Sequence, residues 1–550
     1  MLLLDPAAGS GNFLTETYLS LRRLENEVLE IVHKGNLIMG ELDDPIKVSI
    51  KQFYGIEING YAVAVAQTAL WIAESQMLKE TEQVIGKEIE FLPLKSNPNI
   101  IEGNALTLDW ESVVPKDKLN YIMGNPPFVG KKYRSDQQRD DMRIYSDESG
   151  KPYANAGILD YVSCWFFKAS QYMNGTHVCA ALVATNSITQ GEQVIAMWKP
   201  LYERFNIRIN FAWKSFAWDS ESTNKAHVHC VIIGFSATDS IAPKKLFSQS
   251  GICDITNNIS PYLMDTPVIF VESRRQPICN VPSLIYGSFA LDNGGKYTVD
   301  EEEYLQLIKK EPNIKKYFKL FLGADEFINH IKRYCIWLKD ADIGEVKKSP
   351  ILYSRINSVK EWRSQSNRPQ TKKAAQTPML FAEIRQPDSD YLAVPITSSL
   401  NRQYIPMGYM SKEVIASNHL FVLPDATLYH LGILMSSTHM AWMRAIAGRR
   451  KSDYNYSNLI VYNNFPWPTP TDKQKAKIEQ TAQSILDARA KFPDASLADL
   501  YDETTMPPEL RKAHEANDKA VMAAYGFKAS MAEPEIVAEL LEMYQKLTEA

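Results

Sequence analysis

Two short stretches of the sequence carry residue types that could bind a ligand and do chemistry beside it. The first, "LLLDPAAGSGNFL", follows an apolar run at the start of the chain and holds Gly9 and Gly11. Glycines let a loop turn tightly and approach a ligand closely, and a helix that begins just after offers free N–H groups. A glycine loop alone would suit any nucleotide-like ligand.

The second stretch, "YIMGNPPFVG", ends an apolar run with Asn125, Pro126, Pro127 and Phe128. Two prolines can neither continue a helix nor sit in a central strand, so the strand must end at Asn125. The loop then presents a side-chain amide, backbone carbonyls and an aromatic ring together. Its substrate should be one that uses all three groups at once.

Two further strand ends carry ligand-type residues. "GIEI" places Glu57 at the end of a second strand, where a carboxylate commonly binds a ribose diol, and "EGNAL" offers Asn104 near an adenine ring. Open α/β sheets bind ligands at the edge formed by the carboxyl ends of their strands. Four successive strand ends of this kind predict one nucleotide-like site rather than ordinary turns.

The elements that must position these residues follow an alternating βαβα rhythm up to about residue 235. Predicted strands span 1–5, 53–58, 100–106, 119–125, 177–185, 207–213 and 226–235, and predicted helices span 13–29, 61–78 and 160–173. This rhythm predicts an α/β domain with a mainly parallel sheet and helices on both faces. The last two strands lack a clear helix between them, which favours an antiparallel pairing.

The rest of the chain has a different organisation. From about residue 240 the runs are short and rich in Pro, Trp, Tyr and Arg, which indicates a separate α+β domain. "NNFPWPTP" (463–470) reads as an extended linker, and 472–492 has helical spacing with capping residues at its start. We expect three domains, at 1–265, 266–470 and 471–550, the last a helical tail.

Composition excludes several classes of protein. The chain has 550 residues, a net charge of −5 and six cysteines without a C-x-x-C pair, which is typical of reduced thiols in a cytosolic protein. The sequence has no long uncharged apolar run and no signal peptide, so we expect a cytoplasmic protein without a membrane span. The slightly negative charge argues against an overall basic coat, although a local basic cleft remains compatible with it.

With these motifs assembled, a family resemblance is clear. "DPAAGSGNFL" followed by "NPPF" resembles the class I S-adenosylmethionine-dependent DNA adenine-N6 methyltransferases, in the gamma order with a target-recognition domain behind. "FYGIEINGYAVAVAQTALWIAESQM", "LVATNSITQGEQV" and "GRRKSDYNYSNLIVYNNFPWP" resemble the modification half of the Type IIL (MmeI-like) restriction–modification enzymes. The resemblance implies a Rossmann-like methyltransferase domain, S-adenosylmethionine as cofactor, and double-stranded DNA of a prokaryotic nucleoid as partner.

The resemblance also implies roles for the motif residues. The Asn125 side-chain oxygen and the Pro126 carbonyl would accept the two N–H groups of an adenine amine, and Phe128 would stack on the base. In-line geometry would then supply much of the catalysis. The expected catalytic set is Asn125, Pro126, Pro127 and Phe128, and the expected cofactor set is Asp5, Ala7, Gly9, Gly11, Asn12, Phe13, Glu57, Ile58, Asn104 and Ala105.

Contacts to DNA are expected in both halves of the chain. The target base must leave the duplex, and the resemblance adds a second aromatic side chain for it, Phe216 first and Trp218 second. "KKYR" and "AGRRKSDYNYSN" could contact phosphates and bases, the latter because basic and aromatic residues alternate. The expected basic contacts are Lys131, Lys132, Arg449, Arg450 and Lys451, beside Tyr454 and Tyr456, with Arg385, Arg402 and Arg444 as lesser candidates.

The same residues also indicate which other reactions, and whether a metal site, remain compatible with the sequence. A cytosine-C5 mechanism needs a nucleophilic cysteine in the catalytic loop, and the first cysteine is Cys164, so that chemistry fails. Cytosine-N4 methylation follows the same logic as adenine-N6 and stays open. Enzymes that methylate a protein glutamine share the motif but are short chains. His227 and His229 share a strand face without a third ligand nearby, so we expect no metal.

The start of the chain suggests a second reading. In the resembled family a nuclease, and a helix that completes the methionine side of the cofactor pocket, lie upstream of the methyltransferase. Here only four residues precede Asp5, so we expect both to be missing and the nuclease to be separate or lost. The alternative function is a catalytically weak or silent DNA-binding remnant of a truncated restriction–modification enzyme.

Overall fold

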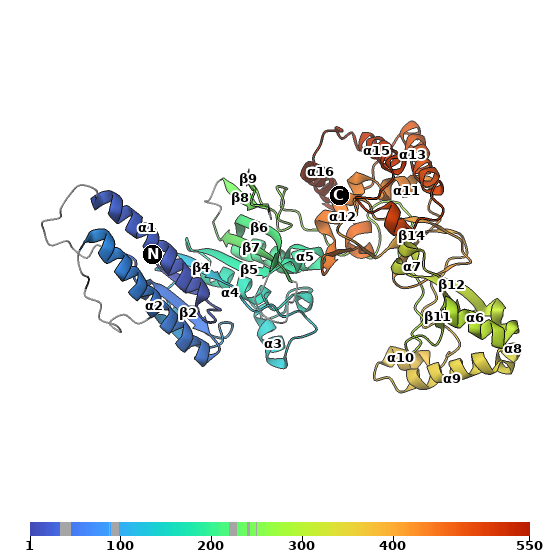
Figure 1. Cartoon of the computed structure of the whole chain (residues 1–550), viewed down its shortest axis with the longest axis horizontal. Coiled ribbons are helices and arrows are strands. Elements are labelled where there is room, and N and C mark those ends of the chain that lie inside the picture. Colours follow the sequence, from blue (N-terminus) through green and yellow to red (C-terminus); the bar gives the residue numbers. More distant parts are fainter. Residues whose placement is uncertain are drawn as a thin grey trace. The chain divides into compact units, whose positions relative to one another are not determined.

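The computed structural model describes residues 1–33, 46–86, 89, 98–218, 228–238, 243–248 and 250–549. These residues form two compact units, Met1–Phe270 and Val271–Ala550 (Figure 1). No helix in these described ranges is long and apolar enough to cross a membrane.

The described part of the first unit holds one nine-stranded sheet in the order β3-β2-β1-β4-β5-β7-β6-β8-β9. Its strands are β1 (Leu3–Asp5), β2 (Phe53–Glu57), β3 (Asn99–Glu102), β4 (Tyr121–Gly124), β5 (Cys179–Thr185), β6 (Arg208–Trp218), β7 (Val228–Ser236), β8 (Lys244–Phe247) and β9 (Cys253–Thr256). The first five are parallel, and β7 runs antiparallel to both β5 and β6. The predicted α/β fold is therefore confirmed, together with the antiparallel final pair. The short strands β8 and β9 were not predicted.

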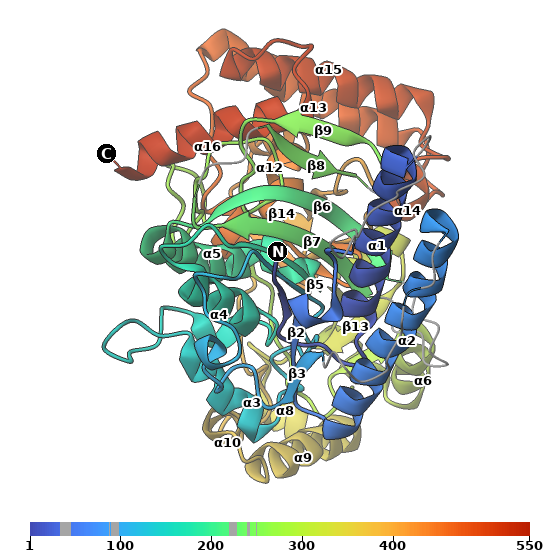
Figure 2. The same cartoon turned by 90° about the vertical axis from the view of Figure 1, so that its left-hand side faces the viewer.

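Helices cover both faces of this sheet (Figure 2). They are α1 (Asn12–His33), α2 (Gly60–Ile85), α3 (Asp136–Asp141), α4 (Ser163–Met173) and α5 (Gly191–Phe205). The chain moves one way along the sheet from β1 to β3 and the other way from β4 to β5, so right-handed crossovers put α1 and α2 opposite α4. Helix α5 was not predicted from the sequence; it contains Pro200, a residue type that is disfavoured inside helices.

Local capping fixes the strand ends that face the ligand edge. The Asn59 side chain caps α2 by accepting from the backbone N–H groups of Tyr61 and Ala62, at 3.0 and 3.4 Å. This cap lies two residues beyond Glu57, so the position at which β2 stops is set by side-chain hydrogen bonding. Below it, the rings of Tyr18 and Phe53 meet edge to face in the core between α1, α2 and the sheet.

The second unit contains three small sheets in its described residues, in the orders β10-β18-β14-β16, β11-β13-β12-β17 and β15-β20-β19. The strands are β10 (Ile285–Tyr286), β11 (Thr298–Asp300), β12 (Phe318–Leu322), β13 (Arg333–Ile336), β14 (Tyr391–Pro395), β15 (Thr397–Ser398), β16 (Gly408–Met410), β17 (Ile415–Ala416), β18 (Leu420–Pro424), β19 (Gly448–Arg450) and β20 (Asp453–Asn455). The helices among them are α6 (Glu301–Lys310), α7 (Ala324–Asn329), α8 (Ile343–Lys348), α9 (Pro350–Ser364), α10 (Pro369–Ala374), α11 (Leu428–Leu434) and α12 (Ser437–Ile446).

The C-terminal part is helical, as predicted, with α13 (Asp472–Ala490), α14 (Leu497–Leu500), α15 (Pro508–Tyr525) and α16 (Glu533–Glu549). Thr471 and Gln474 form the expected capping box at the start of α13. This part packs onto the rest of the second unit through specific polar contacts. The Asn517 amide donates to the Gly432 carbonyl at 2.8 Å, and the Tyr404 hydroxyl donates to Asp518 at 2.7 Å.

The segment 463–470 is not the linker that its prolines suggested. Phe465 and Trp467 are buried, 1% and 6% exposed, and their rings pack against each other. The Asn464 amide, fully buried, donates to the carbonyls of Glu272 and Leu459 at 2.7 and 2.8 Å. The linker prediction is wrong because extended backbone here is stabilised by core packing and side-chain hydrogen bonds rather than exposed to solvent.

Candidate active site

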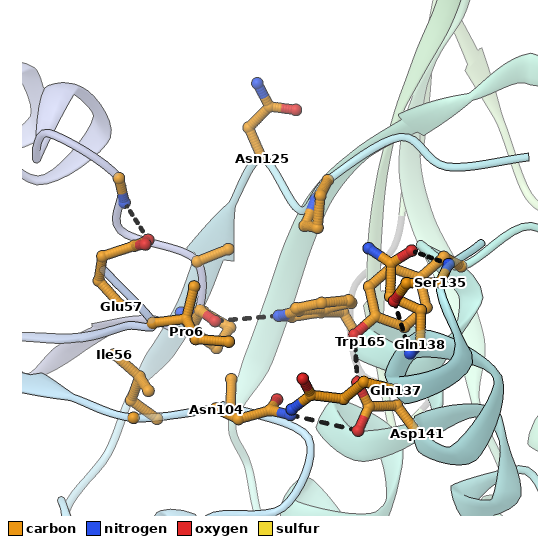
Figure 3. A pocket seen from close by; sticks show the side chains of 17 residues that line it. Pro6, Ile56, Glu57, Asn104, Asn125, Ser135, Gln137, Gln138, Asp141 and Trp165 are labelled. Atoms are coloured by element: carbon orange, nitrogen blue, oxygen red, sulfur yellow. Dashed lines mark hydrogen bonds between the residues drawn. The ribbon is translucent and has the colours of Figure 1, made fainter. Parts of the chain in front are cut away.

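A cavity of about 450 Å³ lies at the carboxyl ends of β1, β2, β3 and β4 (Figure 3). Its volume is in the range of small-molecule sites. It is lined by Pro6, Ala7, Gly9, Ile56, Glu57, Ile58, Gly103, Asn104, Ala105, Asn125, Pro127, Ser135, Gln137, Gln138, Asp141, Tyr161 and Trp165. All four strand ends singled out in the sequence therefore meet at one cavity.

The glycine loop and Glu57 are joined by hydrogen bonds. The Gly9 backbone N–H donates to one Glu57 carboxylate oxygen at 2.9 Å, and the Asn59 N–H donates to the other at 3.0 Å. Gly9 has φ +54°, and a Cβ built there would meet no protein atom within 4 Å. The loop therefore leaves open space above Gly9, which fits a nucleotide-like cofactor that approaches the backbone.

Gly11 allows α1 to pack closely against α2. It has φ +82°, and a Cβ there would lie 2.8 Å from the Ala66 Cβ on α2. Gly11, with Asn12 and Phe13 at the start of α1, is not among the residues that line the cavity. Their predicted contact with the cofactor stays a prediction.

Asp5 is buried at the end of β1, 1% exposed, and its carboxylate accepts the Ala7 N–H at 2.9 Å. Burial, with a smaller contribution from the nearby Glu57 charge, raises the pKa of this carboxyl to about 7. A Cβ at Gly124 would lie 2.6 Å from the same carboxylate, so the glycine of β4 makes room for Asp5. Asp5 thus orders the loop from beneath and does not itself line the cavity.

One end of the cavity is closed by a network that the sequence did not reveal. Asn104 donates through its amide to one oxygen of Asp141 at 3.2 Å, and the Tyr161 hydroxyl donates to the other at 2.5 Å. Burial, and then the hydrogen bond to Asp141, raises the pKa of Tyr161. Asp141 ends α3 and Tyr161 precedes α4, so elements far from the glycine loop in the chain complete this wall.

Trp165, on α4, completes the same wall. Its indole N–H donates to the Pro6 carbonyl at 2.9 Å, and its ring meets Tyr161 edge to face with centroids 5.2 Å apart. The sequence predicted a helix over 160–173 but gave no signal that its aromatic residues face a ligand. This hydrogen bond ties α4 to the start of the glycine loop, directly after β1.

Asn125 presents a buried acceptor without a protein partner. Its side-chain oxygen has no hydrogen-bond partner among the described residues. Figure 3 shows this side chain pointing away from Asn104 and Asp141. Pro127 lines the cavity, Pro126 is buried, and Phe128 is half-buried and is not among the lining residues. A buried unpaired acceptor is costly, so it indicates a ligand donor at this position.

The predicted DNA contacts of the first unit differ in exposure. Lys131 and Lys132 are exposed, whereas Arg134 of the same run is buried and donates to the Gly157 carbonyl at 3.1 Å. Phe216 is half-buried next to a bulge in β6, with its ring tilted against Trp218. Neither aromatic residue lines the cavity.

In the second unit, the basic segment 449–451 comprises the last two residues of β19 and the first residue of the turn into β20. The Arg449 guanidinium lies 3.8 Å above the Tyr454 ring and donates to the Arg444 carbonyl at 3.1 Å. Burial lowers the pKa of Arg449 to about 10. Arg450 and Lys451 are exposed. Only these last two present their charge freely in this structure.

The aromatic residues beside this turn do not face solvent. Tyr454 and Tyr456 are buried, 4% and 1% exposed, and the Tyr456 hydroxyl lies 2.8 Å from the His439 ring nitrogen. The expectation that they contact bases is wrong, because their rings support the turn from inside. Arg444 is paired with Glu533 at 2.7 Å, Arg385 is paired with Glu383, and Arg402 lines a polar cavity of about 470 Å³.

A metal site is not assigned. His227 lies outside the described residues, and the residues that the structure describes contain no group of three or more His, Cys, Asp or Glu able to hold a metal.

Comparisons with known proteins agree along the whole chain. Three family models match in succession: the MmeI DNA-methyltransferase domain at residues 1–248, the MmeI target recognition domain at 265–469 and the MmeI C-terminal domain at 470–550. The solved structure of the Type IIL restriction-modification enzyme MmeI in complex with DNA is 42% identical with a TM-score of 0.91, and the match covers 100% of this chain and 73% of that chain. The chain belongs to the MmeI family.

A curated relative supports the same assignment. DNA methyltransferase A of Bacillus subtilis (strain 168) is 41% identical over 549 residues, which cover 99% of this chain and 61% of the relative. This chain therefore spans about three fifths of that relative's length. In MmeI-family terms, the cavity lies in the methyltransferase domain, and the β19–β20 turn lies in the target recognition domain.

Proposed function

We propose that this chain transfers a methyl group from S-adenosylmethionine to adenine N6 within a specific double-stranded DNA sequence. The observation that carries the proposal is the unpaired, buried Asn125 oxygen at the cavity that Gly9, Glu57 and Asn104 share. Together, these residues offer a cofactor cradle and an acceptor for an amine. Membership of the MmeI family supports DNA as the substrate.

The residues of the chain divide the work of methyl transfer. Glu57 and the Gly9 loop hold the cofactor, which supplies an electrophilic methyl group on a sulfonium when bound. Asn125 and the Pro126 carbonyl accept the N–H groups of the flipped base and orient the nitrogen lone pair towards that methyl group. Phe128 stacks on the base. No side chain needs to remove a proton before the attack.

Two finer assignments belong to this proposal. Adenine N6 is favoured over cytosine N4 by the resemblance of the Asn-Pro-Pro-Phe motif to adenine enzymes. With genomic DNA as substrate, the protein would work in the prokaryotic cytoplasm at the nucleoid.

The test is transfer of radioactive methyl groups to unmodified genomic DNA, followed by separation of the labelled nucleosides. We expect label in N6-methyladenine for the wild type and almost none for Asn125→Ala, with cofactor affinity kept within a few fold. Label in N4-methylcytosine would replace the adenine assignment. DNA binding without any transfer by the wild type would instead identify a silent DNA-binding protein.

A further inference from the structure

We propose that the Tyr133 ring stacks on a base beside the gap that the flipped adenine leaves in the duplex, and so stabilises the opened DNA. The inference rests on the proposed methyl transfer and adds a DNA contact by a residue that does not line the cofactor cavity. The contact is with the DNA that stays behind, whereas Phe128 is proposed to stack on the base that enters the site.

Tyr133 is more exposed than other side chains of its kind. Its exposed fraction, 85%, is the highest among the large apolar and aromatic side chains that the structure describes. A single exposed apolar residue needs no explanation by itself. The position of this ring and the way the chain holds it are what point to a partner.

The ring lies against the loop that begins at Asn125. A Cβ placed on Gly130 would lie 3.9 Å from the Cδ2 atom of Tyr133, so the ring lies over the chain that directly follows Phe128 and Val129. Asn125 carries the unpaired acceptor proposed to receive the flipped base. A flipped base stays joined to its strand, so the gap it leaves must lie beside this loop.

Hydrogen bonds on both sides hold the turn that carries Tyr133. The Tyr133 N–H donates to the Gly130 carbonyl at 2.9 Å and closes the turn. Before it, the Tyr161 N–H donates to the Val129 carbonyl at 3.0 Å. After it, Arg134 is buried and its guanidinium donates to a backbone carbonyl at 3.1 Å. Because the turn is already ordered, little further ordering is needed when a ligand meets the ring.

The chemistry of the turn fits a nucleic acid. Lys131 and Lys132 belong to the same turn and are exposed, which suits the phosphates on either side of an opened base step. An aromatic ring stacks on any base, because every base has a π face, and so replaces part of the stacking that the duplex loses on flipping. A protein surface or a small apolar ligand would have no use for the two flanking charges.

The test measures DNA affinity with S-adenosylhomocysteine bound, which needs no turnover. The probe is a short duplex with the sequence that the wild type methylates, identified by sequencing the modified bases of treated DNA. We expect Tyr133→Ala to bind this duplex about 10-fold more weakly, the usual effect of losing one stacked base, and Tyr133→Phe to bind like the wild type. The matched control is Tyr121→Ala, because Tyr121 is 46% exposed but begins β4, whose other end leads into Asn125.

A second set of duplexes identifies the stacked base. In each duplex an abasic site replaces either one neighbour of the target adenine or the base opposite it. On one of these duplexes the difference between the wild type and Tyr133→Ala should vanish, because the partner of the ring is missing there. On the others the difference should persist.

A further variant separates stacking from a general loss of structure. Tyr133→Leu keeps an apolar side chain without the flat ring, so it should lose as much DNA affinity as Tyr133→Ala while binding S-adenosylhomocysteine like the wild type. Wild-type DNA affinity for Tyr133→Ala, or a loss that persists on every abasic duplex, overturns the inference and leaves methyl transfer standing. A wild type that methylates no DNA overturns the proposed function and this inference with it.

Discussion

The Glu57 carboxylate accepts the Gly9 backbone N–H at 2.9 Å, which ties the end of β2 to the glycine loop after β1. The same carboxylate also accepts the Asn59 N–H that opens the cap of α2. Glu57 therefore shapes the cavity in addition to lining it, and its loss should affect the loop as well as any direct contact with the cofactor.

Glu57→Ala should weaken binding of S-adenosylhomocysteine by roughly 1–3 kcal/mol, the usual cost of losing charge-assisted hydrogen bonds. Calorimetry measures this directly. The matched control is Glu102→Ala, because Glu102 pairs with Glu57 in the strand register but does not line the cavity. Equal affinities for Glu57→Ala and the wild type would show that Glu57 is no cofactor ligand.

The two glycines of the loop should separate stability from binding. Gly11→Ala places a methyl 2.8 Å from the Ala66 Cβ, so it should cost about 1–3 kcal/mol of stability through overpacking. The methyl group of Gly9→Ala meets no protein atom, so this variant should lose only about 1–2 kcal/mol of stability, because of its left-handed backbone. That methyl group would enter the cavity, however, so Gly9→Ala should weaken cofactor binding more than Gly11→Ala does. Thermal midpoints measure the stability of both variants, and calorimetry measures their cofactor binding. Weaker cofactor binding by Gly11→Ala than by Gly9→Ala would contradict the prediction.

Asp5 should make stability depend on pH. An unfolded aspartate titrates near 3.8, but burial moves the folded pKa to about 7, so between these values only the folded state keeps the proton. Raising the pH through this window should therefore lower stability by up to about 1.4 kcal/mol per pH unit, and the slope should vanish above it.

The measurement is the difference in thermal midpoint between the wild type and Asp5→Asn from about pH 4 to pH 8. Asn cannot titrate, so the thermal midpoint of the wild type should fall relative to that of Asp5→Asn as the pH rises towards 7. The effects of other titratable groups largely cancel in this difference. A difference that does not change with pH would mean that Asp5 is ionised throughout.

Arg449 and Arg450, both in strand β19 of the β19–β20 hairpin, should act differently on DNA. Arg450→Ala should reduce the slope of log affinity against log salt by about 0.9, the value for one lost phosphate contact. Arg449 is stacked on Tyr454 and bonded to a backbone carbonyl, so Arg449→Ala should weaken the turn and lower affinity at every salt concentration with the slope kept. Titrations at several salt concentrations distinguish the two, and a reduced slope for Arg449→Ala would show that its side chain leaves Tyr454 to reach the DNA.

The strand-end residues of the site could be predicted because the position at which an apolar run ends is a local property of the sequence. Asp5, Glu57, Asn104 and Asn125 each follow an apolar run, and parallel strands bring such ends to one edge. Asp141 and Trp165 could not be predicted in this way. They lie on helices after the Asn125 loop, and only tertiary packing brings them to Asn104 and Pro6.

The fold was predicted best where hydrophobic periodicity was strong. Helix α5, which contains Pro200, was not predicted, and the segment 463–470 was wrongly predicted to be a linker because of its prolines. In that segment Phe465 and Trp467 were the overlooked signal. Large aromatic residues at close spacing favour burial whether or not the backbone is regular.

The buried segment 463–470 has a consequence for exchanging DNA specificity between relatives. A chimera joined at residue 470 would cut through a core in which Tyr525 bonds Pro466, Asn517 bonds Gly432 and Tyr404 bonds Asp518. Each mismatched partner across that junction would leave a buried polar group unsatisfied. Recombination should therefore succeed when residues 271–550 are exchanged as one piece. Inherited changes in DNA recognition would then be accompanied by changes in the C-terminal helices.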